Sequence, residues 1–192
     1  GNGMICYEFK GGTGTSSRRI EVGGKSYTVA ALVQANYGDR SWFTVLGVPV
    51  GQHMTEGWRR GKETGSIIVI LATDAPLSDT NLRQLAKRAG MGIGRSGSPG
   101  GQSSGDIFLA FSTADEMPPP LKADPVIARH SINWEHLNTI YDAAVQAVVE
   151  AVINSIVAGE DVATFKPRGY VCPALDTEQL MKIMADYGRA KV

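Results

Sequence analysis

The chain has 192 residues, enough to bury one good hydrophobic core, so we expect a single domain over residues 1–192. Basic and acidic side chains balance at 19 each, so the chain has no net charge to attract nucleic acid or an anionic membrane, and neither is an expected partner. The apolar runs have strand length or belong to an amphipathic helix, which predicts no membrane span.

Histidine and cysteine residues are few and widely spaced. The two cysteines, Cys6 and Cys172, lack metal-ligand spacing and are typical of small buried hydrophobic residues. The histidines His53, His130 and His136 form no paired ligand motif. We therefore expect neither a metal nor a cofactor.

The first predicted element in the chain is a β-hairpin of residues 18–22 and 25–35. Gly23-Gly24 supplies the positive φ values that a two-residue turn needs. The preceding stretch at 11–17, GGTGTSS, resembles a phosphate-binding loop but lacks the Gly-Lys-Ser/Thr ending of a P-loop, and no clear helix follows it. A tight turn, or closely spaced backbone lining the active site, fits this stretch better.

Residues 37–65 contain turn signals, the basic pair Arg59-Arg60 and a polar run at 61–64. The latter part predicts an exposed linker. The apolar, largely β-branched run at 66–72, SIIVILA, then predicts a buried strand that begins with Ser66.

Helices dominate the predicted second half of the chain. One is expected from a Ser78 or Asp79 N-cap, with Leu82, Leu85, Ala86 and Ala89 as its apolar stripe and Gly90 as its end. A Gly/Ser loop at 90–105 and a strand at 106–112 follow, then a long amphipathic helix at 134–158 and a closing helix at 176–187, with Asp176 as N-cap and Gln179 as capping-box partner. This order predicts a layered α/β fold and no regular βαβ repeat.

The Gly65-Ser66 pair suggests a self-cleaving N-terminal nucleophile. The Ser66 hydroxyl can attack the carbonyl of Gly65, where no Cβ blocks the approach. Hydrolysis of the resulting ester would free an α-amine with a pKa of about 8, which can act as a base near neutral pH. An ordinary Gly-Ser turn before a strand is the alternative.

Three further residues are candidates for the same chemistry. Ser104 and Asp106 lie two apart, so alternation places them on one face, where a hydroxyl bonded to a carboxylate can orient a nucleophile or relay its proton. The alternative for Asp106 is an Asx turn. The amide of Asn36 can donate to an oxyanion, although Asn is also common in turns. The segment Arg95-Ser96-Gly97-Ser98 could bind an anion, but a mobile loop lining the site is the safer interpretation.

Four segments resemble one known family in order and spacing. They are MICYEFKGGTGTSSR at 4–18, LVQANYG at 32–38, TGSIIVILATDAPL at 64–77 and SSGDIFLAFST at 103–113. The chain resembles the family of L-aminopeptidase D-amidase/D-esterases and β-peptidyl aminopeptidases. The resemblance implies an α/β/β/α-type sandwich, shared in outline with ornithine acetyltransferases. Family precursors carry a long segment ahead of the position that matches Gly1.

The resemblance also implies roles for the candidate residues. Cleavage between Gly65 and Ser66 would leave residues 1–65 as the end of a large subunit and residues 66–192 as the small subunit. Ser66 would be the nucleophile of self-cleavage and of turnover through an acyl-enzyme, and Asn36 would be the oxyanion donor. Ser104 and Asp106 would support the nucleophile. The base stays open between the Ser66 amine and a relay through Ser104 and Asp106.

The expected partners are a short peptide, amide or ester substrate and the chain's own upstream segment. The resemblance further suggests a homo-oligomer of processed heterodimers, in the cytoplasm or the periplasm. Two alternatives remain. One is an acyltransferase of the related fold, although those enzymes look to use threonine as nucleophile where this chain has Ser66. The other is an inactive fragment or binding module that lacks its upstream half.

Overall fold

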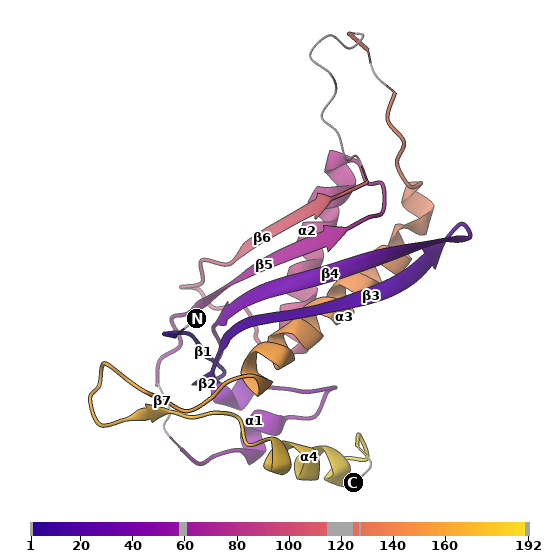
Figure 1. The fold of residues 1–192 in the computed structure, drawn as a ribbon. Helices are drawn as coiled ribbons and strands as arrows, with labels where there is room; N and C mark the ends of the chain where they lie inside the picture. Colours follow the sequence, from indigo (N-terminus) through magenta and orange to yellow (C-terminus); the bar gives the residue numbers. More distant parts are fainter. Residues whose placement is uncertain (1, 58–60, 115–124, 127, 191–192) are drawn as a thin grey trace.

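A four-stranded sheet forms the centre of the protein (Figure 1). The computed structural model describes residues 2–57, 61–114, 125–126 and 128–190. The strands lie in the order β3 (Gly12–Val22), β4 (Lys25–Asn36), β5 (Ser66–Thr73) and β6 (Ile107–Ser112). The first three are antiparallel neighbours, and β6 runs parallel to β5.

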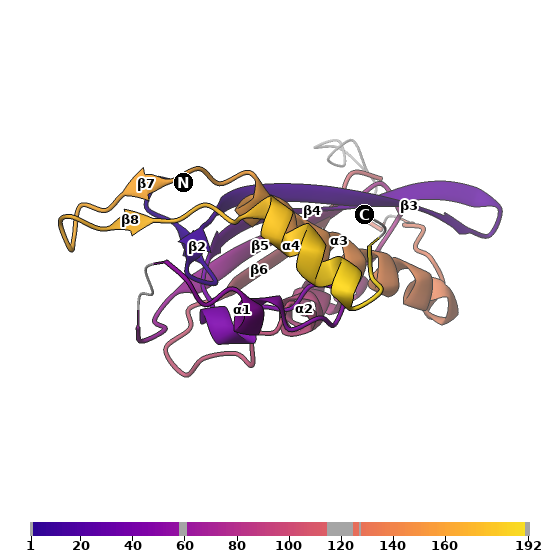
Figure 2. The same ribbon diagram turned by 90° about the horizontal axis from the view of Figure 1, so that it is seen from below.

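Two long helices, α2 (Asp79–Arg95) and α3 (Leu137–Val157), pack on one face of this sheet and against each other (Figures 1 and 2). The shorter elements are β1 (Ile5–Cys6), β2 (Phe9–Lys10), η1 (Arg40–Trp42), α1 (Val50–His53), η2 (Trp134–His136), β7 (Val162–Ala163), β8 (Val171–Cys172) and α4 (Thr177–Asp186). The layered α/β class predicted from the sequence is confirmed: in the described part of the chain, one helical layer covers the four-stranded sheet, and β1–β2 and β7–β8 form two small two-stranded sheets.

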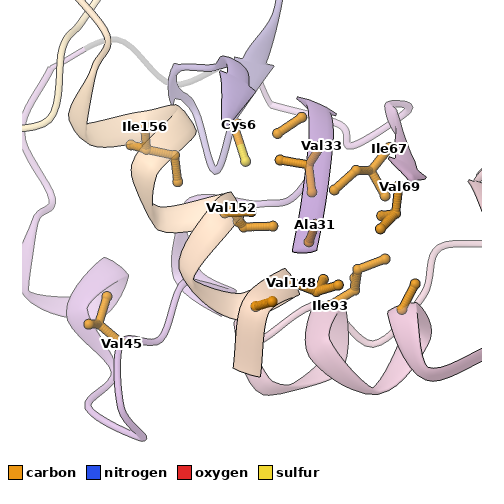
Figure 3. Close-up of a cluster of buried hydrophobic side chains, with 14 of the residues drawn as sticks. Cys6, Ala31, Val33, Val45, Ile67, Val69, Ile93, Val148, Val152 and Ile156 are labelled. Carbon is orange, nitrogen blue, oxygen red and sulfur yellow. The ribbon is translucent and has the colours of Figure 1, made fainter. Parts of the chain in front are cut away.

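The core lies between the sheet and these two helices (Figure 3). Alternate residues of β4 and β5 are fully buried on the helical side, among them Val33, Ile67 and Val69. Val148 and Val152 of α3 pack against them. Because side chains alternate along a strand, this pattern fixes which residues of β5 face the helices and which face away.

Helix α3 is unusually apolar for a helix of its length. Together with η2 it is long and apolar enough, by length and composition alone, to cross a membrane. In the structure it contacts β3, β4 and α2, and 56% of its most apolar window is buried. We interpret it as the central core helix, which is apolar because it is surrounded by protein.

The opposite face of the sheet is apolar and, within the part of the chain that the structure describes, it is open. Ile68, Ile107, Leu109 and Phe111 project from it with exposed fractions of 42–59%. A groove of about 420 Å³ crosses this face, lined by residues of β3, β4, β5 and β6. Large apolar surfaces of this kind are typical of interaction sites.

The hairpin is longer than predicted. Gly23 and Gly24 form its turn with φ values of +60° and +74°, as expected. However, β3 starts at Gly12, so residues 12–17 are strand and the alternative of a tight turn at 11–17 was wrong. The small residues have a packing role here, because a Cβ on Gly14 would lie 1.9 Å from the carbonyl oxygen of Ala151 in α3.

Helix α2 also extends beyond its predicted end. It passes Gly90 and continues to Arg95, so the predicted loop at 90–105 is shorter at its start. Ser78 caps it, accepting from the Asn81 N–H at 3.2 Å. A Cβ on Gly92 would lie 2.7 Å from the Val148 side chain, so close contact with α3 requires glycine there. This tertiary packing outweighs the low helix propensity of glycine.

Other predicted elements agree with the structure to within a few residues. The strand predicted at 66–72 is Ser66–Thr73, and the helix predicted at 134–158 is η2 followed by α3. Asp176 caps α4 by accepting from the Gln179 N–H at 2.9 Å. Cys6 and Cys172 are buried, as expected.

Residues 37–65 divide into two parts. The first part contains η1 and α1 and contributes Phe43 and Val50 to the core. The latter part, where the structure describes it, is largely exposed up to Thr64. The basic pair Arg59-Arg60 lies outside the described residues.

Candidate active site

Ser66 and Asn36 lie opposite each other at one end of the sheet. Ser66 is the first residue of β5 and Asn36 is the last residue of β4, and the antiparallel register pairs them. A shift of one residue would turn Ile67 and Val69 out of the core, so the hydrophobic pattern holds this register firmly. Two of the predicted site residues are thereby brought together.

Gly65 has no room for a side chain. A Cβ built on it would lie 1.9 Å from the carbonyl oxygen of Asn36 and 3.0 Å from Oε1 of Glu63. The close approach of the two backbones therefore requires glycine immediately before Ser66. The sequence alone suggested only an unhindered carbonyl, and the structure adds that the residue is confined.

The segment 104–106 meets β5 at the same point. The Gly105 N–H donates a hydrogen bond to the Ser66 hydroxyl oxygen at 2.9 Å. The Asp106 carboxylate accepts from the Ile67 N–H at 3.0 Å, and the Asp106 N–H donates to the Ser104 hydroxyl at 3.3 Å. All the predicted residues are therefore adjacent. Their catalytic roles stay predictions, and the bonds recorded for Asp106 and Ser104 run through backbone N–H groups.

The side chain of Asn36 is oriented by strand β1. Its Oδ1 accepts a hydrogen bond from the Ile5 N–H at 2.9 Å. This bond occupies the amide oxygen and leaves the NH₂ group as the donor that can serve an oxyanion. Asn36 is the last residue of β4 and has an extended backbone. It is therefore not a turn asparagine, which was the alternative.

A small pocket adjoins Ser66. Its lining includes Tyr37, Glu63, Gly65, Ser104 and Asp106, and its volume is about 10 Å³. That is close to the space needed by one water molecule and far below that of a peptide. Glu63 and Gly65, in the segment that precedes Ser66, form part of the pocket's wall. Sequence reasoning missed Glu63, and only its position three residues before Ser66 could have drawn attention to it.

Buried hydroxyl groups fix the backbone next to Asn36. The Ser96 hydroxyl lies 2.9 Å from the Tyr7 hydroxyl and 3.1 Å from the Tyr37 hydroxyl, and it donates to the Ile93 carbonyl at 2.8 Å. Burial raises the pKa of Tyr37 well above its usual range, and it raises that of Tyr7 as well. Both tyrosines therefore stay neutral and tie the site to the end of α2.

The segment at 95–98 borders the site but does not form an anion site through Ser96. Ser96 is fully buried within the hydroxyl network, so its side chain is not presented to an anion. Ser98 lines the small pocket, in agreement with a loop that borders the site. Among the residues that the structure describes, no group of three or more histidine, cysteine or carboxylate side chains is arranged to hold a metal.

Comparisons with known proteins identify the family of the chain. The family model described as peptidase family S58 matches residues 1–169. The β-peptidyl aminopeptidase BapA of Sphingosinicella microcystinivorans is 42% identical over 98% of this chain, and the BapA of Sphingosinicella xenopeptidilytica is 40% identical over 83%. The chain spans 51% and 43% of the lengths of these two relatives.

Solved structures of aminopeptidases share the fold. The L-aminopeptidase D-Ala-esterase/amidase of Ochrobactrum anthropi, a serine aminopeptidase with a variant of the Ntn hydrolase fold, matches with a TM-score of 0.91 and 50% identity, over 98% of this chain and 52% of that one. A β-aminopeptidase of Burkholderia sp. matches with a TM-score of 0.83 and 40% identity, over 97% and 52%. The chain belongs to peptidase family S58.

Proposed function

We propose that the chain forms the catalytic part of a self-processing serine aminopeptidase, in which cleavage after Gly65 makes Ser66 the N-terminal nucleophile. The observation that carries this proposal is the set of contacts around one peptide bond. A confined Gly65 precedes a serine whose hydroxyl accepts from the Gly105 N–H, directly opposite the amide of Asn36.

Self-cleavage would proceed in two steps. The Ser66 Oγ attacks the Gly65 carbonyl carbon, the Gly65–Ser66 amide bond breaks, and the hydroxyl proton ends on the released Ser66 amine. Water then hydrolyses the Gly65 ester, leaving a carboxylate on Gly65 and a free hydroxyl and amine on Ser66. The NH₂ of Asn36 is the proposed donor to the oxyanion that forms in each step.

Turnover would repeat this chemistry on a substrate. The Ser66 Oγ attacks the carbonyl of an N-terminal residue, the amine or alcohol leaves with a proton, and water releases the acyl group. The base is the Ser66 amine or a relay through Ser104 and Asp106. Similarity to β-peptidyl aminopeptidases and to an L-aminopeptidase D-Ala-esterase/amidase supports short peptides, amides or esters as substrates.

The open face of the sheet supports an upstream segment as partner. Its exposed apolar side chains need a cover, and the chain spans only about half the length of its relatives. A large subunit formed by that segment would supply a second layer over β5 and β6 and complete the substrate pocket beside Ser66. Such processed heterodimers are then expected to assemble into a homo-oligomer.

A test compares two versions of the small piece, each co-expressed with the large piece of the full-length protein. One version begins at Ser66, and the other retains Gly65 ahead of it. The proposal expects hydrolysis of unblocked peptide amides with the first version only, because the second lacks the free Ser66 amine. Equal activity of the two would contradict the proposal of an N-terminal nucleophile.

A further inference from the structure

The linker that leads to Ser66 is held by carboxylates at two points. The Gly61 N–H donates to Oε1 of Glu8 at 3.4 Å, and the Gly65 N–H donates to Oε1 of Glu63. Glu8 is itself buried, with an exposed fraction of 5%, and the buried guanidinium of Arg40 donates to its carbonyl oxygen at 2.8 Å. The linker is thus held to the body of the protein at Gly61, and a second contact, within the linker itself, restrains Gly65 immediately before the nucleophile.

The other side of the bond to be cleaved is also fixed. Ser66 is held in register by β4, and its hydroxyl accepts from the Gly105 N–H at 2.9 Å. Gly65 has no side chain to limit its φ and ψ angles, so its backbone conformation must be restrained by a neighbouring group. The Glu63 carboxylate supplies that restraint through the Gly65 N–H.

We propose that Glu63 is a positioning residue for self-cleavage. Its side-chain oxygen holds the Gly65 N–H and thereby aims the Gly65 carbonyl at the Ser66 hydroxyl. Glu63 neither gives nor takes a proton in the acyl shift, in which the Oγ–C bond forms, the C–N bond breaks and the proton passes to the Ser66 nitrogen. This inference rests on the proposed function and adds a residue to it.

Positioning can be distinguished from proton transfer by the choice of substitution. Glu63→Gln keeps an oxygen that accepts from the Gly65 N–H but is no longer a carboxylate base. Glu63→Met has a similar length and removes the strong acceptor. A positioning role survives the first change and not the second, whereas a role as base is lost in both.

The experiment follows cleavage of the full-length precursor, synthesised in a short pulse and sampled over time on denaturing gels. We expect Glu63→Met to slow cleavage by about tenfold to a hundredfold and Glu63→Gln to stay within about threefold of wild type. Lys62→Met, at the exposed neighbouring position, is the matched control and should cleave normally. In the uncleavable Ser66→Ala background, Glu63→Met and Glu63→Gln should both leave the melting temperature unchanged, because Glu63 lies outside the hydrophobic core.

Each contrary result has a distinct meaning. Normal cleavage of Glu63→Met would overturn the inference, and equally slow cleavage of both variants would replace positioning by a role for the carboxylate charge. A melting temperature lowered by Glu63→Met in the Ser66→Ala background would overturn the inference in favour of a general structural role. A wild-type precursor that is active but never cut would overturn the proposed function itself, whatever the Glu63 variants do.

Discussion

Replacing Gly65 by alanine should block self-cleavage, because the structure leaves no space for the added methyl group. The new Cβ would lie 1.9 Å from the Asn36 carbonyl oxygen, whereas real Cβ contacts essentially never fall below 3.0 Å. The difference, 3.0 − 1.9 = 1.1 Å, is the least distance by which the two backbones must separate. A misplacement of about 1 Å at a reacting centre can cost roughly a hundredfold in rate.

The assay is the time course of precursor cleavage on denaturing gels. Gly65→Ala should slow the appearance of the two pieces by about a hundredfold. Gly94→Ala is the matched control, because a Cβ on Gly94 meets nothing within 4 Å and its cleavage rate should not change. Wild-type cleavage of Gly65→Ala would refute the reasoning from confinement and would mean that the end of β4 yields easily.

Three further predictions concern catalysis and stability. Asn36→Ala should lower the kcat of pre-processed enzyme by about a hundredfold to a thousandfold with a smaller change in KM, and an unchanged kcat would exclude it as oxyanion donor. Asp106→Asn keeps an acceptor for the Ile67 N–H, so it should lower kcat without changing the melting temperature if the carboxylate charge has a role. Ser104→Ala should also lower kcat at an unchanged melting temperature. Arg40→Met should destabilise the fold by about 3 kcal/mol, measured by denaturant unfolding, because it removes the countercharge 3.9 Å from buried Glu8.

Elements with a strong local pattern could be predicted from the sequence. The β-branched run after Ser66 and the apolar face of α3 are each long enough for the periodicity to identify them. The pairing of Asn36 with Ser66 could not be predicted from local pattern, because it depends on the register of two strands joined by a long linker. Only the resemblance to a known family indicated from the sequence that Asn36 and Ser66 belong to one site.

Features set by tertiary contacts were beyond local reasoning. Glycine has a low helix propensity, and Gly90 was therefore predicted as the end of a helix. In the structure α2 continues to Arg95, and Gly92 lies in close contact with Val148. Tyr7 has a left-handed backbone, with φ of 49°, which its sequence does not suggest, and its hydroxyl bonds to residues far along the chain. The contact of Glu63 with the Gly65 N–H likewise depends on the folded conformation of the linker.

The central claim is that Ser66 becomes the N-terminal residue of an active enzyme, and intact mass spectrometry of the purified full-length protein tests it most directly. The account predicts two pieces, the smaller one beginning Ser-Ile-Ile-Val-Ile-Leu, and a single uncut, inactive chain for Ser66→Ala. A wild-type protein that hydrolyses peptide amides at full rate as one uncut chain would contradict it.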